Sequence, residues 1–355
     1  MSTPKKAKKI EHFHDLPLPT NDWPIAGNAG TVPVEQETST IQAFGISSNG
    51  RRIVGTHFNF DRNESHVITF SHFLGTILPG GSGSEPWVAD PISQDSQVSG
   101  RGINNEGDVV GFMLTAALDP DQTVPYFRPG NVPINLEPGI FATQPTTLRG
   151  AEIILPDDRT ASSVASGINN NRIVVGSYVD LSSENSVGFS LDLRLQTPGV
   201  GLVNVGKQIP GANSDNQGVQ ILSINDAGDM LATSDALGNL VGLMDKYGQR
   251  KWFPFNPSSV VGSGSLPEVN LMGINNNRTI VGIVPGAPVT GFYCQVYADG
   301  KTSPAVQVSH PAATATSFHG ISDNGMICGT YKTDAAYNHP FVYQLTNYEF
   351  PNWGA

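Results

Sequence analysis

Six equivalent positions of a recurring motif hold six different side chains, and two of these could do hydrogen-bond chemistry. Each position precedes a glycine, or Ser223 in one copy, that is followed by isoleucine. The six residues are Phe44, Arg101, Ser166, Leu222, Met272 and His319. Apolar surface mixed with a few polar donors is typical of small-molecule pockets. Variation at one level of a repeat can also reflect relaxed packing between the repeated units, and that interpretation stays open.

Arg101 and His319 are the two candidate catalytic residues at this level. Arginine keeps its charge across the working pH range and offers a planar fork of donors, whereas neutral histidine donates from one nitrogen only. We therefore expect Arg101 to be the main donor to a substrate oxygen. The alternative is that Arg101 caps a loop or pairs with an acidic neighbour. Residues expected to surround or orient the substrate are Phe44, His57, Trp87, Tyr178, Leu222, Met272 and Tyr331.

The motif that carries these residues recurs six times, which determines the prediction of the fold. Its isoleucines follow one another at intervals of 47 to 65 residues, and a repeat of this length indicates a repeat architecture. The copies are FGISSNGRRIVG from Phe44, RGINNEGDVVG from Arg101, SGINNNRIVVG from Ser166, LSINDAGDMLA from Leu222, MGINNNRTIVG from Met272 and HGISDNGMICG from His319.

Each copy predicts a strand, a tight polar turn and a second strand. Asn and Asp favour such turns, and Gly107, Gly228 and Gly325 can take positive φ. A third apolar strand and usually a fourth follow each hairpin. Four antiparallel strands in about 50 residues form one propeller blade, so the sequence predicts an all-β, six-bladed β-propeller. We expect the N-terminal strand to pair with the last blade and close the ring, residues 1–9 to form a disordered basic tail, and residues 10–355 to form one domain.

The GINNxGxIVG pattern and the sequence His339-Pro340-Phe341 resemble HAF-type propeller repeats across nearly the whole chain. More narrowly, the organisation resembles the fungal β-propeller hetero-Diels–Alderases of tropolone sesquiterpenoid biosynthesis. This resemblance implies a cofactor-free pericyclase that joins an o-quinone methide to a humulene-type alkene in secondary metabolism. It transfers no role to an individual residue. The alternative is a noncatalytic carbohydrate- or protein-binding propeller.

Composition and charge exclude several other classes of protein. With 14% charged residues and a net charge of −11, the chain lacks the concentrated basic surface that nucleic acid requires. It has no apolar run of membrane-spanning length. The sequence as given shows no secretory signal, which predicts a cytoplasmic protein, with a secreted mature form as the alternative. Cys294 and Cys328 are expected core residues. No cofactor is expected, and the His12-Phe13-His14 stretch is a weak signal for a metal, so none is predicted. We expect small apolar substrates as partners.

Overall fold

Each motif copy folds as the predicted hairpin at the inner edge of a sheet. The computed structural model describes residues 12–16, 23–24, 31–32, 39–59, 64–71, 87–89, 97–114, 123–128, 130, 160–181, 183–194, 202–205, 208–209, 218–255, 269–333 and 338–345. The predicted tail, residues 1–9, lies outside them. In the hairpin of GINNNRTIVG, the Arg278 amide donates to the Asn275 carbonyl at 3.0 Å and the Asn275 amide donates to the Thr279 carbonyl at 3.2 Å.

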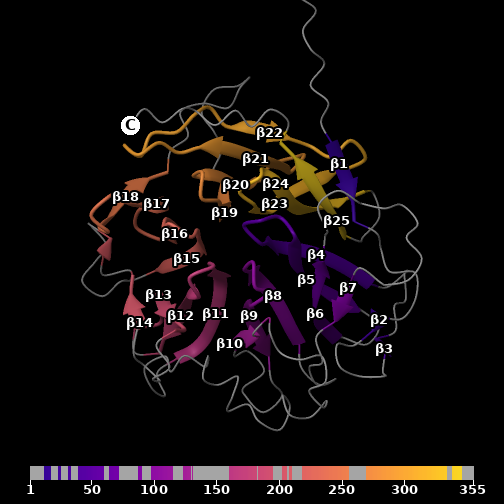
Figure 1. Ribbon diagram of the computed structural model, residues 1–355, viewed down its shortest axis with the longest axis horizontal. Coiled ribbons are helices and arrows are strands. Elements are labelled where there is room, and N and C mark those ends of the chain that lie inside the picture. Colours follow the sequence, from indigo (N-terminus) through magenta and orange to yellow (C-terminus); the bar gives the residue numbers. More distant parts are fainter. Residues whose placement is uncertain are drawn as a thin grey trace, which may run out of the picture.

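The strands form antiparallel sheets placed around a central axis (Figure 1). Five sheets have four strands and are complete blades. They comprise β4 (Ser39–Ile46), β5 (Arg52–Asn59), β6 (Glu64–Ser71) and β7 (Trp87–Ala89); β11 (Thr160–Ile168), β12 (Ile173–Asp180), β13 (Asn185–Asp192) and β14 (Leu202–Asn204); β15 (Val219–Ile224), β16 (Met230–Ser234), β17 (Gly238–Met244) and β18 (Arg250–Pro254); β19 (Asn270–Ile274), β20 (Thr279–Val284), β21 (Thr290–Gln295) and β22 (Val306–Val308); and β23 (Ala315–Ile321), β24 (Met326–Lys332), β25 (Asn338–Gln344) and β1 (His12–Asp15).

A further sheet has three strands within the described residues: β8 (Gln97–Ile103), β9 (Val109–Leu114) and β10 (Thr123–Arg128). It contacts β5 and β6 on one side and β11 on the other. The all-β propeller is therefore observed, while four strands per sheet are found in five sheets. The strands β2 (Trp23–Pro24) and β3 (Thr31–Val32) pair separately as a two-stranded sheet.

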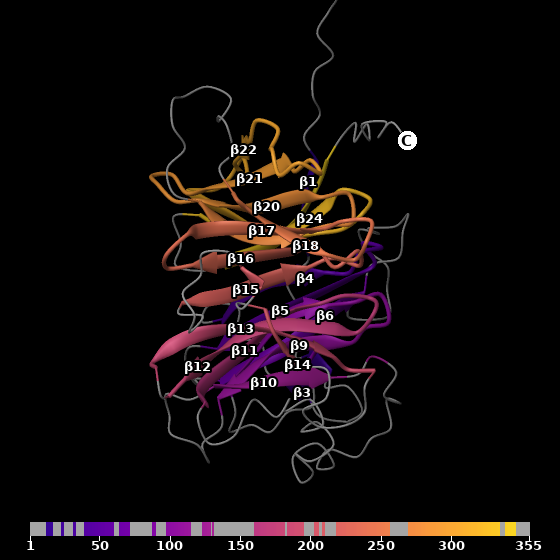
Figure 2. The same ribbon diagram turned by 90° about the vertical axis from the view of Figure 1, so that its left-hand side faces the viewer.

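The first and last described strands belong to the same sheet, as expected for the N-terminal strand. β1 pairs antiparallel with β25, with Phe13 opposite Tyr343. The Leu16 amide extends this pairing by donating to the Pro340 carbonyl at 3.0 Å. β23, β24 and β25 also contact β4 of the first blade. The side view shows neighbouring sheets lying face to face along the ring (Figure 2).

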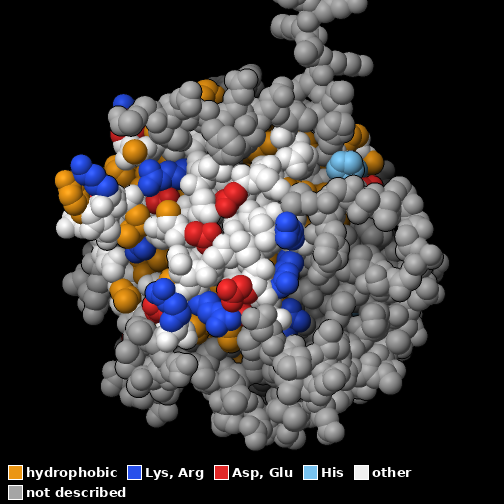
Figure 3. All heavy atoms as spheres, viewed as in Figure 1, with side chains coloured by type: hydrophobic (Ala, Val, Ile, Leu, Met, Phe, Trp, Pro, Cys, Tyr) orange, Lys and Arg blue, Asp and Glu red, His pale blue; other side chains and the backbone are white. Residues whose placement is uncertain are grey.

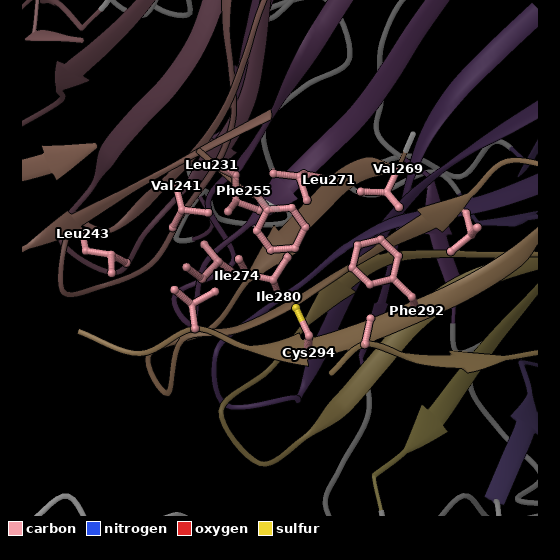
Figure 4. Close-up of a cluster of buried hydrophobic side chains, with 13 residues drawn as sticks. Leu231, Val241, Leu243, Phe255, Val269, Leu271, Ile274, Ile280, Phe292 and Cys294 are labelled. Atoms are coloured by element: carbon pink, nitrogen blue, oxygen red, sulfur yellow. The ribbon is translucent and has the colours of Figure 1, made fainter. Parts of the chain in front are cut away.

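The hydrophobic core is distributed between neighbouring sheets. One cluster joins the sheet of β15–β18 to that of β19–β22 and includes Leu231, Leu271, Ile280, Phe292 and Cys294 (Figure 4). Both cysteines are free and buried, as predicted, and burial raises the pKa of each thiol to about 12. Each sheet therefore buries its faces against its neighbours, which fixes the inner strands around the axis.

A glycine has positive φ in the turns of four motif copies, including the three predicted glycines, and an arginine has it in the other two. Gly50, Gly107, Gly228 and Gly325 have φ of 72°, 88°, 86° and 75°. In the Asn-rich turns, the residue with positive φ is Arg172 or Arg278, at 56° and 59°, instead of an asparagine. Arginine in this conformation costs roughly 1–2 kcal/mol. Both arginines bind a buried aspartate of the preceding sheet, and this contact offsets the cost.

Candidate functional site in the axial cavity

The six candidate residues share a backbone feature, a β-bulge, that the sequence does not predict. In every inner strand the ladder skips the residue before the glycine, or before Ser223 in β15, so that residue has no partner in the neighbouring strand. Such a β-bulge re-aims the side chain of the extra residue. The six bulged residues, named the bulge ring here, are Phe44, Arg101, Ser166, Leu222, Met272 and His319.

Close contact between the inner strands explains the glycine that follows five of the six bulges. A Cβ on Gly102 would lie 3.0 Å from the Gly167 Cα, and one on Gly320 would lie 3.3 Å from the Gly45 Cα. The backbones of neighbouring sheets therefore touch at this level, as the motif predicts. The five glycines of the motif leave room for this close approach, Ser223 takes the position in the fourth copy, and the bulge residues line the space around the axis.

The bulge ring lines one end of the axis. All six of its residues surround a cavity with about 70 Å³ of room. The motif isoleucines line this cavity and also a second one, of about 50 Å³, at the other end of the axis. They are only 5–8% exposed and lie between the two cavities: Ile46, Ile103, Ile168, Ile224, Ile274 and Ile321. The axis thus has an apolar constriction with a distinct site at each end.

Arg101 lies in the bulge-ring cavity as a cation stacked on aromatic rings. Its Cζ is 4.0 Å from the centroid of Phe44 and 5.2 Å from that of Phe112. Within the described residues, its guanidinium makes no ion pair or side-chain hydrogen bond, and no carboxylate lines the cavity. Burial lowers the pKa of Arg101 to about 10, so it remains a cation at neutral pH. In the described part of the chain, Arg101 has no partner that would support the alternative of loop capping or ion pairing.

His319 is the second polar group of the ring, and it is neutral at pH 7. Burial and, secondarily, the charge of Arg101 lower its pKa to about 3. Its Nε2 lies 3.1 Å from Thr330 Oγ1, while Nδ1 has no partner within the described residues. The ring also meets Phe44 edge-on, with centroids 5.2 Å apart. Phe44 therefore contacts both polar groups of the ring.

Three other predicted residues do not line the cavity, and the side chain of a fourth, Trp87, lies outside the described residues. His57 is fully buried in β5. Tyr178 packs beside Phe189 with ring centroids 6.4 Å apart, and Tyr331 stacks on His310 with centroids 3.8 Å apart. These three positions follow the closing glycine on the second strand, where alternation directs side chains between neighbouring sheets. Trp87 is in β7, which is the outermost strand of its sheet. Their contact with the substrate stays a prediction.

The opposite end of the axis carries a ring of polar turn residues, named the turn ring here: Ser48, Asn105, Asn170, Asp226, Asn276 and Asp323. The Asn170 amide donates to Asp226 Oδ1 at 2.8 Å, the Asp226 amide to Asn276 Oδ1 at 2.7 Å and the Asn276 amide to Asp323 Oδ1 at 2.9 Å. The Asp323 amide donates to the Ser48 carbonyl at 2.7 Å, which joins the last sheet to the first.

The turn ring places two carboxylates, those of Asp226 and Asp323, at its end of the axis. Figure 3 shows acidic side chains near the middle of one face of the molecule, with Lys and Arg side chains around them. Burial, countered by Asn276 and reinforced by Asp226, raises the pKa of Asp323. No group of three or more His, Cys, Asp or Glu residues in the described ranges could hold a metal ion. Those ranges also contain no helix able to span a membrane.

Comparison with known proteins supports the fold and does not identify an activity. No family model matches the chain, and no curated protein matches it. Among solved structures, a Trypanosoma rangeli sialidase mutant displaying trans-sialidase activity is similar with a TM-score of 0.50 and 11% identity. The match covers 94% of this chain and 59% of the sialidase.

Two fungal proteins give weaker structural matches. Prolyl oligopeptidase B from Galerina marginata has a TM-score of 0.42 and 11% identity, over 84% of this chain and 39% of that protein. A triple arginine mutant of AofleA from Arthrobotrys oligospora has a TM-score of 0.43 and 8% identity, over 92% of both chains. The sialidase match, at 11% identity, indicates the propeller fold alone, because one fold supports many chemistries.

Proposed function

We propose that the bulge-ring cavity is the active site of a cofactor-independent pericyclase. The reaction is an intermolecular hetero-Diels–Alder cyclisation between a tropolone-derived o-quinone methide and a humulene-type alkene. One carbon–carbon and one carbon–oxygen bond form from the π electrons of the two reactants, so no oxidant, nucleophile or metal is needed. The observation that supports this proposal is the unpaired cation of Arg101 beside the apolar residues Phe44, Leu222 and Met272.

Arg101 supplies the electrophilic activation in this proposal. The oxygen of the heterodiene gains electron density as the carbon–oxygen bond forms, so a donor directed at it binds the transition state more tightly than the ground state. Stacking on Phe44 holds the guanidinium in place before the substrate arrives. His319 remains neutral at working pH and acts as a secondary hydrogen-bonding group.

The size of the cavity decides which part of the substrate enters it. A volume of about 70 Å³ holds a few small atoms, so the oxygen-bearing end of the heterodiene lies beside Arg101 and the hydrocarbon lies outside at the mouth. Holding the two reactants close together can lower the activation free energy by several kcal/mol, and by about 7–11 kcal/mol at most.

The choice of this particular reaction rests on a resemblance to a protein family. The motif and the His339-Pro340-Phe341 strand resemble HAF-type repeats, and the overall organisation resembles the fungal Diels–Alderases. The proposal includes a six-bladed ring in which the sheet of β8–β10 is the sixth blade. It also includes a cytoplasmic location and apolar small molecules as the partners.

The small cavity also favours a second function, a noncatalytic binding propeller. A site of this size could bind one polar group of a carbohydrate or a protein without promoting a reaction. Such a protein would bind its ligand and leave the cyclisation rate unchanged.

The test uses purified protein with a chemically generated o-quinone methide and humulene. Replacing Arg101 by Met removes the donor while keeping much of its length, and we expect the cyclisation rate to fall about 100- to 1,000-fold. Arg51→Met is the matched control, because Arg51 is exposed at the opposite end of the axis. Product yield and stereochemistry equal to those of the enzyme-free reaction would refute catalysis, and binding without turnover would favour the second function.

A further inference from the structure

The cation of Arg101 has no counter-charge in the cavity that contains it. Besides glycines, the lining combines one arginine with a neutral histidine, two serines, the six motif isoleucines and the apolar side chains of Phe44, Leu222 and Met272, and it contains no carboxylate. Arg101 is half-buried, and a charge withdrawn from water is costly unless it is paired and hydrogen-bonded. The described residues supply neither partner, so the guanidinium is available to a ligand of opposite charge.

The donors of Arg101 are free to receive that ligand. A guanidinium carries five N–H groups, and the contact with Phe44 is a stacking contact that uses none of them as a conventional hydrogen bond. No protein acceptor within the described residues occupies them. Such a fork matches two oxygens that share one charge, as in a carboxylate, and can bind them in a bidentate way.

Charge and size restrict the ligand further. Arg101 is the only cation lining the cavity among the described residues, because His319 is neutral. One positive charge balances a monoanion and would leave a dianion, such as a phosphate monoester, with an excess negative charge in a confined space. Phe44, Leu222 and Met272 add apolar surface beside the cation, which suits a hydrocarbon next to the charged group.

We propose that the bulge-ring cavity binds a monoanion with a planar head group, in which two oxygens share the charge, and with an otherwise apolar structure. An aliphatic carboxylate and an ionised tropolone both meet this description. The inference deepens the proposed function and rests on it in taking the bulge-ring cavity as the ligand site. Turnover is a separate matter, so binding and cyclisation can fail independently.

The experiment measures the affinity of hexanoate by calorimetry and compares it with hexanamide, its neutral counterpart of nearly equal shape. We expect hexanoate to bind at least about 10-fold more tightly than hexanamide, since charge-assisted hydrogen bonds are the stronger class. Arg101→Met should remove this preference and leave hexanamide binding unchanged, while Arg51→Met should behave as the unaltered protein. Equal binding of hexanoate and hexanamide to the unaltered protein would overturn the inference.

A conservative variant tests whether the fork of donors is needed. Arg101→Lys keeps the charge and loses the fork, so an intermediate preference for hexanoate is expected and full preference would contradict bidentate binding. If Arg101→Met does not fold, the comparison of hexanoate with hexanamide on the unaltered protein still decides the matter. Arg101-dependent cyclisation without a preference for the anion would refute the inference alone, whereas preferential anion binding without cyclisation would refute only the proposed reaction.

Discussion

The two ends of the axis are built from the same inner hairpins and serve different purposes. At the turn end, equivalent positions hold Asn, Asp or Ser, and their amides and side chains form hydrogen bonds from sheet to sheet. At the bulge end, equivalent positions hold six different residue types, and Arg101 makes no ion pair within the described residues. The first end uses its polar groups to hold sheets together, and the second leaves a cation available.

The difference shows how a repeat can divide stability from function. Positions that bond to their counterparts in the next sheet must keep compatible side chains, because each one is donor and acceptor in turn. A bulged residue has no counterpart in the strand ladder, so its side chain can vary without breaking a backbone bond. The bulge ring is therefore the place where this fold can acquire a site.

The largest effect on stability is expected from removing a buried aspartate near the turn end. Asp229 is fully buried and accepts from Asn225 Nδ2, the Met244 amide and Arg278 Nε, the last at 2.9 Å. Asp229→Ala leaves these donors unpaired and should lower the free energy of unfolding by about 3–5 kcal/mol, as measured by urea denaturation. Lys301→Ala, at an exposed ion pair, is the control and should change little. A loss no larger than that of the control would contradict the structural role of this aspartate.

A smaller loss is expected from a break in the turn ring itself. Asn276 Nδ2 donates to Asp226 Oδ2 and to Asp323 Oδ2, both at 2.8 Å. Asn276→Ala leaves two carboxylates without this shared donor, and we expect a loss of about 2–3 kcal/mol from charge-assisted hydrogen bonds. Hexanoate affinity at the other end should stay unchanged. A parallel loss of hexanoate affinity in the folded variant would show that the two ends are coupled.

At the bulge end, His319 should make the stability of the protein depend on pH. The pKa of His319 in the folded protein is depressed to about 3, so the unfolded state binds the proton more readily. The contribution of His319 is complete above its unfolded pKa of about 6.5 and is lost as the pH falls toward 3. Between pH 5.5 and 4, stability should fall about 1.4 kcal/mol per pH unit more steeply than in His319→Gln. Parallel urea-derived profiles for the two proteins would contradict a buried neutral histidine.

The smallest effect is expected from Tyr178, a predicted site residue that the structure places between sheets. Its neighbours include Phe189, and it packs against the cluster that contains Val110 and Leu191. Tyr178→Phe keeps the ring and removes only the hydroxyl, so the affinity for hexanoate should remain within experimental error in the same calorimetric assay. A clear decrease in hexanoate affinity would show that Tyr178 contributes to the site.

Sequence alone predicted the parts of the fold that depend on local patterns. The repeated Gly-Ile pair, the polar turn and the apolar strands that follow imply hairpins and a propeller, because turn chemistry and alternation act over a few residues. Gly107 and Gly228 take positive φ as expected. Arg172 and Arg278 do so unexpectedly, since the aspartates that stabilise them lie 64 and 49 residues away in the sequence.

The candidate site was predicted in part for the same reason. Comparison of the repeats identified the six positions of the bulge ring, because they vary where their neighbours are uniform. His57, Tyr178 and Tyr331 were singled out because they also vary from copy to copy, but they lie on the second strand, which has no bulge to direct their side chains toward the axis. The missing counter-charge of Arg101 could not be read from sequence, because it depends on which side chains from several sheets meet at the axis.

The most direct test of the division between the two ends is a crystal structure with 6-bromohexanoate, whose bromine can be located by anomalous scattering. We predict the carboxylate at Arg101 in the bulge-ring cavity and the bromine at its mouth, near Leu222 or Met272. The Arg101→Met protein should give no bromine signal there under the same conditions. A bromine at the turn end, or an occupied bulge-ring cavity with the carboxylate turned away from Arg101, would contradict the assignment.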